Sequence, residues 1–230
     1  MASAAQPLFL LADSQLLFWR SDGALWLEQA RRQLRPPTPD RPQTAAYIGA
    51  SNGDQPIFFE LFRSAMAGIA LDDCRHIHAQ PSADERAYLA QADLILLAGG
   101  DPHLGWTALQ ASGLPALLQA CYQRGATLRG ISAGAMQLGQ LAWPEHNPSA
   151  PAGIATLGLT PYVVSAHDEP AWSSLRQIIA SDGQQRRGLG IRTGGGAIAY
   201  PDGRLAAVRQ PLDLFSIDAG RIQQRSLAPS

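Results

Sequence analysis

Apolar runs and amphipathic stretches alternate along most of the chain, in the pattern of a parallel sheet covered by helices. Short apolar runs predict strands at residues 7–12, 15–19, 44–50, 74–78, 93–98, 126–129 and 162–166. Apolar residues at helical spacing predict helices at residues 24–34, 54–68, 83–90, 103–110, 114–123, 133–141 and 172–180. The run at 93–98 is the clearest strand, and it leads directly into two glycines.

The last part of the chain has a different pattern. From Gly188 onward, short apolar runs are separated by turn signals at residues 194–196, 201–203 and 218–220. Such spacing is typical of antiparallel hairpins. We therefore expect one α/β domain over residues 1–230. Its sheet should be mostly parallel and doubly wound, with helices on both faces and a C-terminal antiparallel extension. In such sheets, sites form at the carboxyl ends of the strands.

Composition narrows the class of protein. The hydrophobic fraction is 46%, the charged fraction 16% and the formal net charge −1, so neither nucleic acid nor a membrane surface is an expected partner. The longest apolar runs fall short of the roughly 18 residues that a membrane span needs. Because the first apolar run has no basic segment before it, we expect no signal peptide. Two cysteines, Cys74 and Cys121, are too few for a disulfide scaffold or a zinc site. We expect a cytoplasmic protein without metal or cofactor.

The segment Gly130-Ile131-Ser132-Ala133-Gly134 matches G-x-S-x-G, and it stands between a predicted strand and a predicted helix. A serine lifted off a strand end brings the chain before and after it close together, so both flanking positions require small residues. The pattern predicts a nucleophilic serine at Ser132. A glycine-bounded turn whose serine only caps the helix is the alternative.

A serine hydroxyl needs a base, usually a histidine held by a carboxylate. His167 ends the strand at 162–166 and should emerge at the same sheet edge as Ser132. It is therefore favoured over the other histidines, which are His76, His78, His103 and His146.

The carboxylate that orients the base is open between candidates. Glu145 lies between Ser132 and His167 in the chain, whereas Asp168 and Glu169 follow the histidine directly. Neighbouring side chains of an extended chain point in opposite directions, which counts against Asp168.

An oxyanion hole needs two N–H groups aimed at the developing charge. Ala133, directly after the serine, is expected to supply one of them. The Gly99-Gly100 pair at a neighbouring strand end could supply the other, because glycine lets the backbone approach a substrate closely.

Together these features resemble the dipeptidase E and cyanophycinase family of serine peptidases, whose fold is class I glutamine amidotransferase-like, a flavodoxin-like arrangement. Four segments spanning about residues 44–180 carry the resemblance: AAYIGAS at 45–51, LILLAGGDP at 94–102, GISAGAM at 130–136, and 157–167, which ends in the histidine. All four occur in the order and at the spacing found in the family. Glutamine amidotransfer itself is disfavoured, because that activity needs cysteine at position 132.

The resemblance implies Ser132 as nucleophile, His167 as base, and the N–H groups of Gly100 and Ala133 as oxyanion donors. Family members carry an acidic residue about twenty residues before the histidine. Glu145, which is 13 residues after Ser132 and 22 before His167, occupies that place and is our choice for the third triad member.

The resemblance also suggests residues that contact the substrate. Gly99 and Asp101 belong to the Gly-Gly-Asp turn. Arg176, nine residues after His167, is similar in position to an arginine of cyanophycinase-like members and could bind a substrate carboxylate. A surface arginine on a helix is the alternative.

Some positions depart from the family pattern. Cyanophycinases carry further arginines where this chain has Ala171 and Ser173, and an acidic residue where it has Arg192. Dipeptidase E has phenylalanine directly after its histidine, where this chain has Asp168. These departures bear on the substrate more than on the type of reaction.

We therefore expect a serine-type peptidase that hydrolyses small peptides through an acyl-enzyme, with aspartyl or isoaspartyl bonds as candidate scissile bonds. A non-catalytic homologue that binds a peptide or small molecule is one alternative, and an esterase using the same residues is another. A small peptide is the expected partner, and a homodimer is left open.

Overall fold

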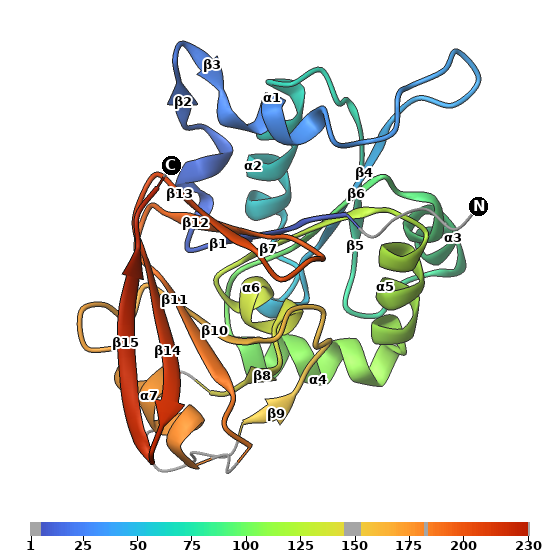
Figure 1. The fold of residues 1–230 in the computed structure, drawn as a ribbon. Helices are drawn as coiled ribbons and strands as arrows, with labels where there is room; N and C mark the ends of the chain where they lie inside the picture. The colour runs from blue at the N-terminus through green and yellow to red at the C-terminus, as the bar shows by residue number, and fades with distance from the viewer. Residues whose placement is uncertain (1–5, 145–152, 182–183, 230) are drawn as a thin grey trace.

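A seven-stranded sheet forms the centre of the computed structural model, which describes residues 6–144, 153–181 and 184–229 (Figure 1). Its strands are β1 (Leu8–Leu11), β4 (Thr44–Ile48), β5 (Asp73–Ile77), β6 (Leu94–Leu97), β7 (Thr127–Ile131), β12 (Gly196–Ala199) and β13 (Leu205–Val208). Their order across the sheet is β13-β12-β1-β7-β6-β4-β5. Five neighbouring strands run parallel to one another: β1, β7, β6, β4 and β5. At one edge of the sheet, β12 and β13 add an antiparallel hairpin. The predicted fold class is confirmed.

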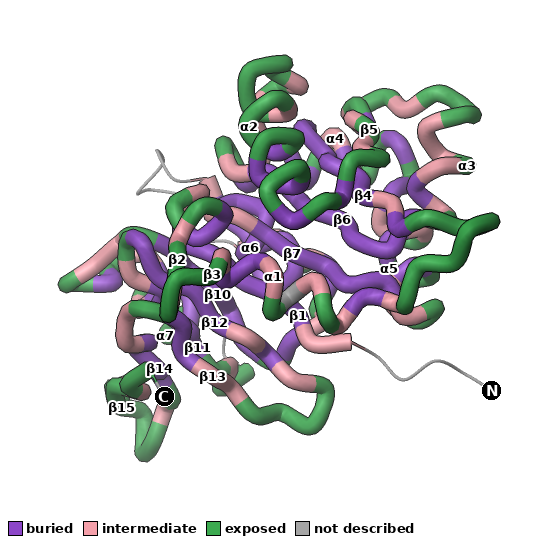
Figure 2. The backbone as a smooth tube through the Cα atoms, turned by 90° about the horizontal axis from the view of Figure 1, so that it is seen from above, coloured by how far each residue is buried: buried purple, intermediate pink, exposed green. Residues whose placement is uncertain are grey.

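Helices cover both faces of this sheet (Figure 1). One face packs against α3 (Ala83–Gln91), α4 (Pro102–Ser112), α5 (Leu114–Gln123) and α6 (Ala133–Leu138), and we call it the α3–α6 face. The other packs against the 3-10 helix η1 (Ser14–Leu17), α1 (Trp26–Arg31) and α2 (Pro56–Ala67), and we call it the α1–α2 face. Side chains alternate along a strand, so Leu8 and Leu10 belong to the first face while Phe9 and Leu11 belong to the second. Figure 2 shows the central strands buried and much of α2 exposed.

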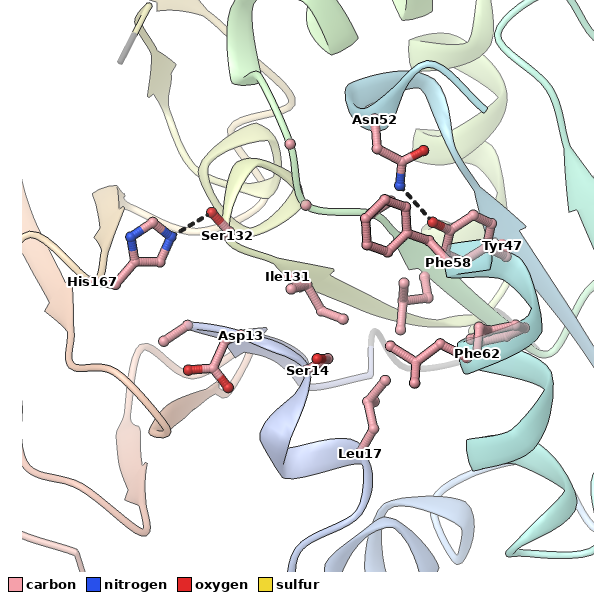
Figure 3. Close-up of a pocket in the computed structure, with 16 residues that line it drawn as sticks. Asp13, Ser14, Leu17, Tyr47, Asn52, Phe58, Phe62, Ile131, Ser132 and His167 are labelled. Atoms are coloured by element: carbon pink, nitrogen blue, oxygen red, sulfur yellow. Dashed lines mark hydrogen bonds between the residues drawn. The ribbon is translucent and has the colours of Figure 1, made fainter. Parts of the chain in front are cut away.

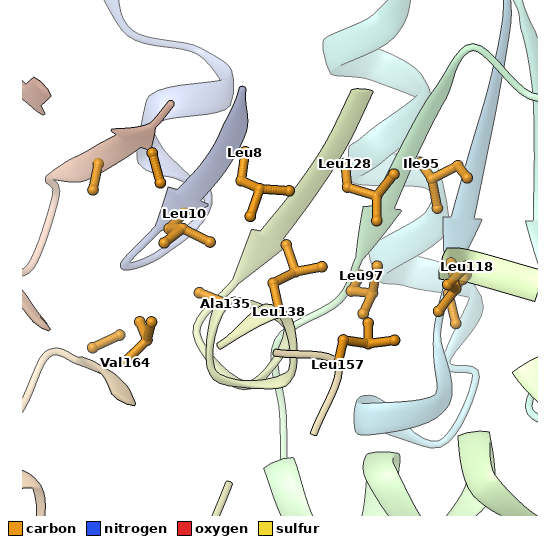
Figure 4. Close-up of a cluster of buried hydrophobic side chains, with 14 of the residues drawn as sticks. Leu8, Leu10, Ile95, Leu97, Leu118, Leu128, Ala135, Leu138, Leu157 and Val164 are labelled. Carbon is orange, nitrogen blue, oxygen red and sulfur yellow. The ribbon is translucent and has the colours of Figure 1, made fainter. Parts of the chain in front are cut away.

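The core on the α3–α6 face is built from aliphatic side chains (Figure 4). Leu10, Leu97 and Leu128 come from three strands, and Leu118 of α5 and Leu138 of α6 pack with them, all buried. This packing holds α6 against the end of β7. The core therefore holds in place the turn that contains the serine motif.

Four further strands form a second sheet, in the order β10-β11-β14-β15. They are β10 (Tyr162–Ala166), β11 (Arg187–Ile191), β14 (Leu212–Asp218) and β15 (Arg221–Leu227). The helix α7 (Ser173–Ser181) packs against this sheet through Leu175, Ile178 and Ile179. The remaining short elements are β2 (Arg20–Ser21), β3 (Ala24–Leu25), η2 (Ala50–Asn52), β8 (Leu141–Ala142) and β9 (Ile154–Ala155). The sequence predicted the strand at 162–166 and the terminal hairpin. It did not predict that they form a sheet separate from the central one.

Two local predictions are wrong, each for an identifiable reason. Residues 15–19 do not form a strand, because the Asp13 carboxylate accepts the N–H of Gln15 at 2.8 Å and starts the turn of η1 instead. The helix predicted at 133–141 ends at Leu138, because the next residue is extended and the chain enters β8.

The helix predicted at 24–34 is also shorter than expected. Ala24 and Leu25 pair with Arg20 and Ser21 as a two-stranded sheet, so α1 begins only at Trp26. Among the described residues, no helix has the length and apolar character needed to cross a bilayer.

Candidate active site

Ser132 occupies the turn between β7 and α6 in a strained backbone conformation, with φ 47° and ψ −109°. A non-glycine residue in such a sparsely populated region costs about 1–3 kcal/mol and persists only where its surroundings hold it there. The N–H of Ser132 donates to the carbonyl oxygen of Leu11, at the end of β1, at 2.9 Å. The strand–turn–helix context predicted for the motif is present.

The two glycines of the motif are required by close backbone contacts. A Cβ on Gly130 would lie 2.4 Å from backbone atoms of Gly134. A Cβ on Gly134 would lie 2.1 Å from the carbonyl oxygen of Leu97 in β6. A side chain at Gly130 would therefore force the turn apart, and one at Gly134 would push α6 away from β6, so both positions require small residues, as the sequence pattern predicts.

His167 follows β10 of the second sheet and reaches across to the serine. Its backbone also adopts a positive φ of 45°, and its N–H donates to the carbonyl oxygen of Ile191 at 2.9 Å. The ring Nε2 lies 2.8 Å from Ser132 Oγ (Figure 3). The nucleophile and base candidates thus come from different sheets and meet within hydrogen-bond distance.

The structure describes two of the three candidates for the carboxylate that orients His167. Glu145 lies outside the described residues. Asp168 Oδ2 is buried without a hydrogen-bond partner in the described part of the chain, and burial raises the pKa of this carboxyl. Burial also acts to raise the pKa of Glu169, but hydrogen bonds, above all from Thr193, outweigh it and lower that pKa. Within residues 6–144, 153–181 and 184–229, no carboxylate is hydrogen-bonded to the His167 ring.

The Gly99-Gly100 turn lies beside the serine because β6 and β7 are neighbouring parallel strands. Gly100 has φ 133°, and a Cβ there would lie 2.0 Å from the carbonyl oxygen of Ser51, so only glycine fits. A Cβ on Gly99 would lie 3.4 Å from Ser132 Cβ, which shows how closely the two turns approach. Asp101 has a local role: its carboxylate accepts the N–H of Leu104 at 2.8 Å and caps α4.

Arg176 and Arg192 both contact residues of the second sheet. Arg176 donates to the Ala171 carbonyl and to Gln224, and its guanidinium lies 4.9 Å from the centre of the Phe215 ring. It is not part of the wall of the cavity beside Ser132. Arg192 forms a two-pronged ion pair with the buried Asp213, at 2.8 and 3.0 Å. The reversed charge at Arg192 is therefore neutralised inside the protein.

A cavity of about 270 Å³ opens beside Ser132, with His167 as part of its wall and most of the other lining side chains on the far side of the serine (Figure 3). Most of its wall is apolar: Ala12, Leu17, Phe58, Leu61, Phe62, Leu96, Ala98 and Ile131. Its polar members include Asp13, Ser14, Asn52 and Tyr47, besides Ser132 and His167. Asn52 Nδ2 donates to Tyr47 Oη at 2.7 Å, and burial raises the pKa of this tyrosine to about 12. The phenol therefore stays neutral and acts as a hydrogen-bonding group.

The sequence did not identify this cavity. Leu17 comes from η1 and Phe58 and Phe62 from α2, which lie side by side on the α1–α2 face. Apolar residues at helical spacing over residues 54–68 favour a position for Phe58 on the core side of its helix, yet it is 42% exposed. In the sequence, the apolar residues at positions 57–59, 61 and 62 cover a wider arc of the helix than one buried face needs, and this excess is the signal that could have indicated a binding wall.

Comparisons with solved structures agree with the fold. A peptidase from an acI-B1 Actinobacterium has a similar structure, with a TM-score of 0.67 at 16% identity over 97% of each chain. A candidate peptidase E of Listeria monocytogenes EGD-e matches with a TM-score of 0.58 at 13% identity, over 98% of this chain and all of the other. At these identities the likeness concerns the fold. No curated protein sequence gives a significant match.

The family is established by sequence. Residues 16–207, most of the chain, match Peptidase family S51, the dipeptidase E family. Its members are serine peptidases, and the resemblance noted in the four motif segments is thereby confirmed. The chain belongs to peptidase family S51.

Proposed function

We propose that Ser132 and His167 hydrolyse an amide bond of a small peptide through an acyl-enzyme. The observation that carries this proposal is the 2.8 Å separation of Ser132 Oγ and His167 Nε2 at a strained turn. A hydrogen bond of this length lets the imidazole take the hydroxyl proton as the oxygen attacks. Holding both groups in place also removes most of the entropic cost of bringing them together.

The proton follows one path through both half-reactions. Ser132 Oγ attacks the scissile carbonyl carbon while its proton passes to His167 Nε2. When the C–N bond breaks, the imidazolium gives that proton to the leaving amine. Water then attacks the ester, His167 takes one of its protons, and the serine oxygen leaves with that proton. The products are an amine and a carboxylic acid.

The N–H groups of Gly100 and Ala133 are the proposed oxyanion donors. Ala133 is the first residue of α6, so no carbonyl of its own helix can accept its N–H. Gly100 is the position where any side chain would collide with Ser51, which leaves backbone alone facing the site. Two fixed donors of this kind stabilise the charge that develops on the carbonyl oxygen.

Glu145 is the proposed third member of the triad. Trp143 lines a recess together with His167 and Asp168. Glu145 is two residues further along, and two residues of extended chain span at most about 7 Å. Asp168 is the alternative, since it lies in the same recess. It is the weaker candidate, because it follows His167 directly and none of the hydrogen bonds of the described residues joins its carboxylate to the imidazole.

The test is loss of the nucleophile. Ser132→Ala should lower kcat on any hydrolysed peptide by at least about 10³-fold and abolish labelling by a fluorophosphonate, with an unchanged circular dichroism spectrum. Ser64→Ala, an exposed serine of α2, is the matched control and should keep both. Labelling that persists in Ser132→Ala would contradict the proposal.

The same assay distinguishes Glu145 from Asp168 as the third member of the triad. We expect Glu145→Gln to lower kcat by about 10³-fold or more and Asp168→Asn by less than about tenfold. The reverse order would assign the triad to Asp168. Wild-type protein that is not labelled at Ser132 would favour the alternative of a non-catalytic binding protein. Labelling with turnover of short-chain esters alone would favour an esterase.

Aspartyl or isoaspartyl specificity, a cytoplasmic location, a single domain and a homodimer stay predictions, and the wall of the cavity beside Ser132 argues against the first of them. The scissile bond in particular rests on the resemblance, because Arg176 and Arg192 are engaged elsewhere in the protein.

A further inference from the structure

The direction of proton transfer determines which part of a substrate faces the cavity. The leaving amine must approach His167 to receive its proton. The acyl residue, whose carbonyl is attacked, therefore extends to the other side of Ser132. In Figure 3 the imidazole lies on one side of Ser132, and the side chains of Ile131, Leu17 and Phe62 lie on the other.

The size of the cavity fits one large side chain. Its volume is about 270 Å³. An apolar protein cavity of about 150 Å³ accepts benzene, and sites for drug-sized ligands begin at about 300 Å³. The space therefore exceeds the need of a phenyl or isobutyl group and lies just below the range of sites for drug-sized ligands. It fits the side chain of a single residue.

The chemistry of the wall disfavours an acidic side chain. No arginine lines the cavity in the described part of the chain, and the carboxylate of Asp13 does. Asp13 is fixed there, because its two oxygens accept the N–H groups of Gln15 at 2.8 Å and Gly194 at 2.6 Å. An aspartate side chain in this cavity would lose its hydration without gaining a cation and would face a like charge.

We propose that this cavity receives the side chain of the residue whose carbonyl Ser132 attacks, and that it selects a large apolar side chain over aspartate. The proposal rests on the proposed function of Ser132 and His167. Phenylalanine, leucine and methionine residues gain the burial of their apolar surface against Leu17, Phe58 and Ile131. The neutral Tyr47 hydroxyl at the wall leaves tyrosine acceptable as well.

The experiment measures acyl-side selectivity with two kinds of probe on the full chain. One is the kcat/KM for p-nitroanilides of phenylalanine, leucine and aspartate, each with a free and an acetylated amino group. The other is the rate at which diphenyl phosphonates bearing a benzyl or a carboxymethyl side chain modify Ser132. We expect the apolar probes to react at least about 100-fold faster than the acidic ones in both series.

A matched pair of variants locates the selectivity. Phe58→Arg places a cation at the cavity wall and should lower the ratio of apolar to acidic reactivity by about tenfold or more. Ile57→Arg adds the same charge one residue earlier on α2, at a side chain that is 68% exposed and outside the cavity wall. This control should keep the wild-type ratio.

The outcomes separate the two proposals. Acidic probes that react as fast as apolar ones, with Ser132 still labelled, overturn the selectivity and leave the peptidase function standing. An equal effect of Phe58→Arg and Ile57→Arg overturns the location in this cavity. If a general fluorophosphonate fails to label Ser132, the function of the site fails, and the selectivity fails with it.

Discussion

The two faces of the central sheet are packed to different degrees. On the α3–α6 face, α6 lies so close to β6 that a single methyl group on Gly134 would collide with the Leu97 carbonyl. On the α1–α2 face, the cavity of about 270 Å³ lies between η1, α2 and the sheet. That second face also buries Arg129, whose guanidinium nitrogens have no hydrogen-bond partner among the described residues. The tightly packed face holds the strained serine, and the incompletely packed face leaves room for a substrate.

The largest expected effect comes from a substitution that disrupts the close packing on the α3–α6 face. Gly134→Ala puts a Cβ 2.1 Å from backbone, which cannot move as a flexible side chain could. We expect kcat to fall by at least about 100-fold, because displacing the turn by about 1 Å misplaces the nucleophile. The free energy of unfolding should fall by about 3 kcal/mol. Enzyme assay and urea unfolding measure the two effects.

Gly99→Ala is the matched control for stability. A Cβ at Gly99 would lie 3.4 Å from its nearest neighbours, which is ordinary van der Waals contact. We expect its unfolding free energy to stay within about 1 kcal/mol of the wild type. Equal destabilisation by both substitutions would mean that the close approach of α6 and β6 is not what holds the turn.

The tight turn is also the part of the site that the sequence predicts best. The requirement for glycine at Gly130 is local, because residues four apart must touch across one turn, whereas Gly134 must be small because α6 packs against Leu97 of the neighbouring strand β6. His167 follows from the rule that strand ends gather at one edge, although it comes from a second sheet that the strand pattern did not distinguish from the first. Local chemistry and strand order were sufficient for both.

The cavity and the buried arginine could not be predicted in the same way. The wall joins Leu17 to Phe58, about forty residues apart, and depends on how η1 and α2 pack. Arg129 lies within an apolar run, where a charge would ordinarily suggest an exposed or paired position, yet it is fully buried over the Phe9 ring at 5.0 Å. Burial of this kind depends on tertiary packing, which periodicity does not contain.

The next largest effect is expected from substitution of Arg129, which is buried on the α1–α2 face. Burial lowers its pKa to about 9, and no carboxylate compensates it among the described residues. Arg129→Met should therefore raise the free energy of unfolding by about 1–2 kcal/mol, because an apolar side chain of similar length replaces an uncompensated charge. Urea unfolding at pH 7 measures the change.

Arg192→Met is the matched control, with the opposite sign expected. Arg192 pairs with Asp213, whose side chain is 2% exposed, so its loss leaves a buried carboxylate without its cation. We expect destabilisation by about 2 kcal/mol, below the range for fully buried pairs because Arg192 is 39% exposed. If Arg129→Met destabilises as Arg192→Met does, Arg129 contributes to the fold through its stacking on Phe9.

The smallest expected effect concerns pH and a helix of the tight face. Glu85 of α3 accepts the N–H of Ser82 at 2.6 Å and lies 2.5 Å from His78 Nδ1. Burial acts to raise its pKa, but the hydrogen bonds from His78 and Ser82 outweigh burial and lower the pKa to about 2. The folded state therefore binds this proton less readily than the unfolded state does. The stabilisation is complete above the unfolded value of about 4.3 and is lost as the pH falls toward 2.

Glu85→Gln should accordingly be less stable than the wild type at pH 7, and this difference should shrink steadily between about pH 4.3 and 2. Glu60→Gln, an exposed carboxylate of α2, is the control and should follow the wild type across the range. Urea unfolding at a series of pH values measures both curves. A difference between Glu85→Gln and the wild type that stays constant with pH would mean that the capping geometry of α3, rather than the charge of Glu85, supplies the stability.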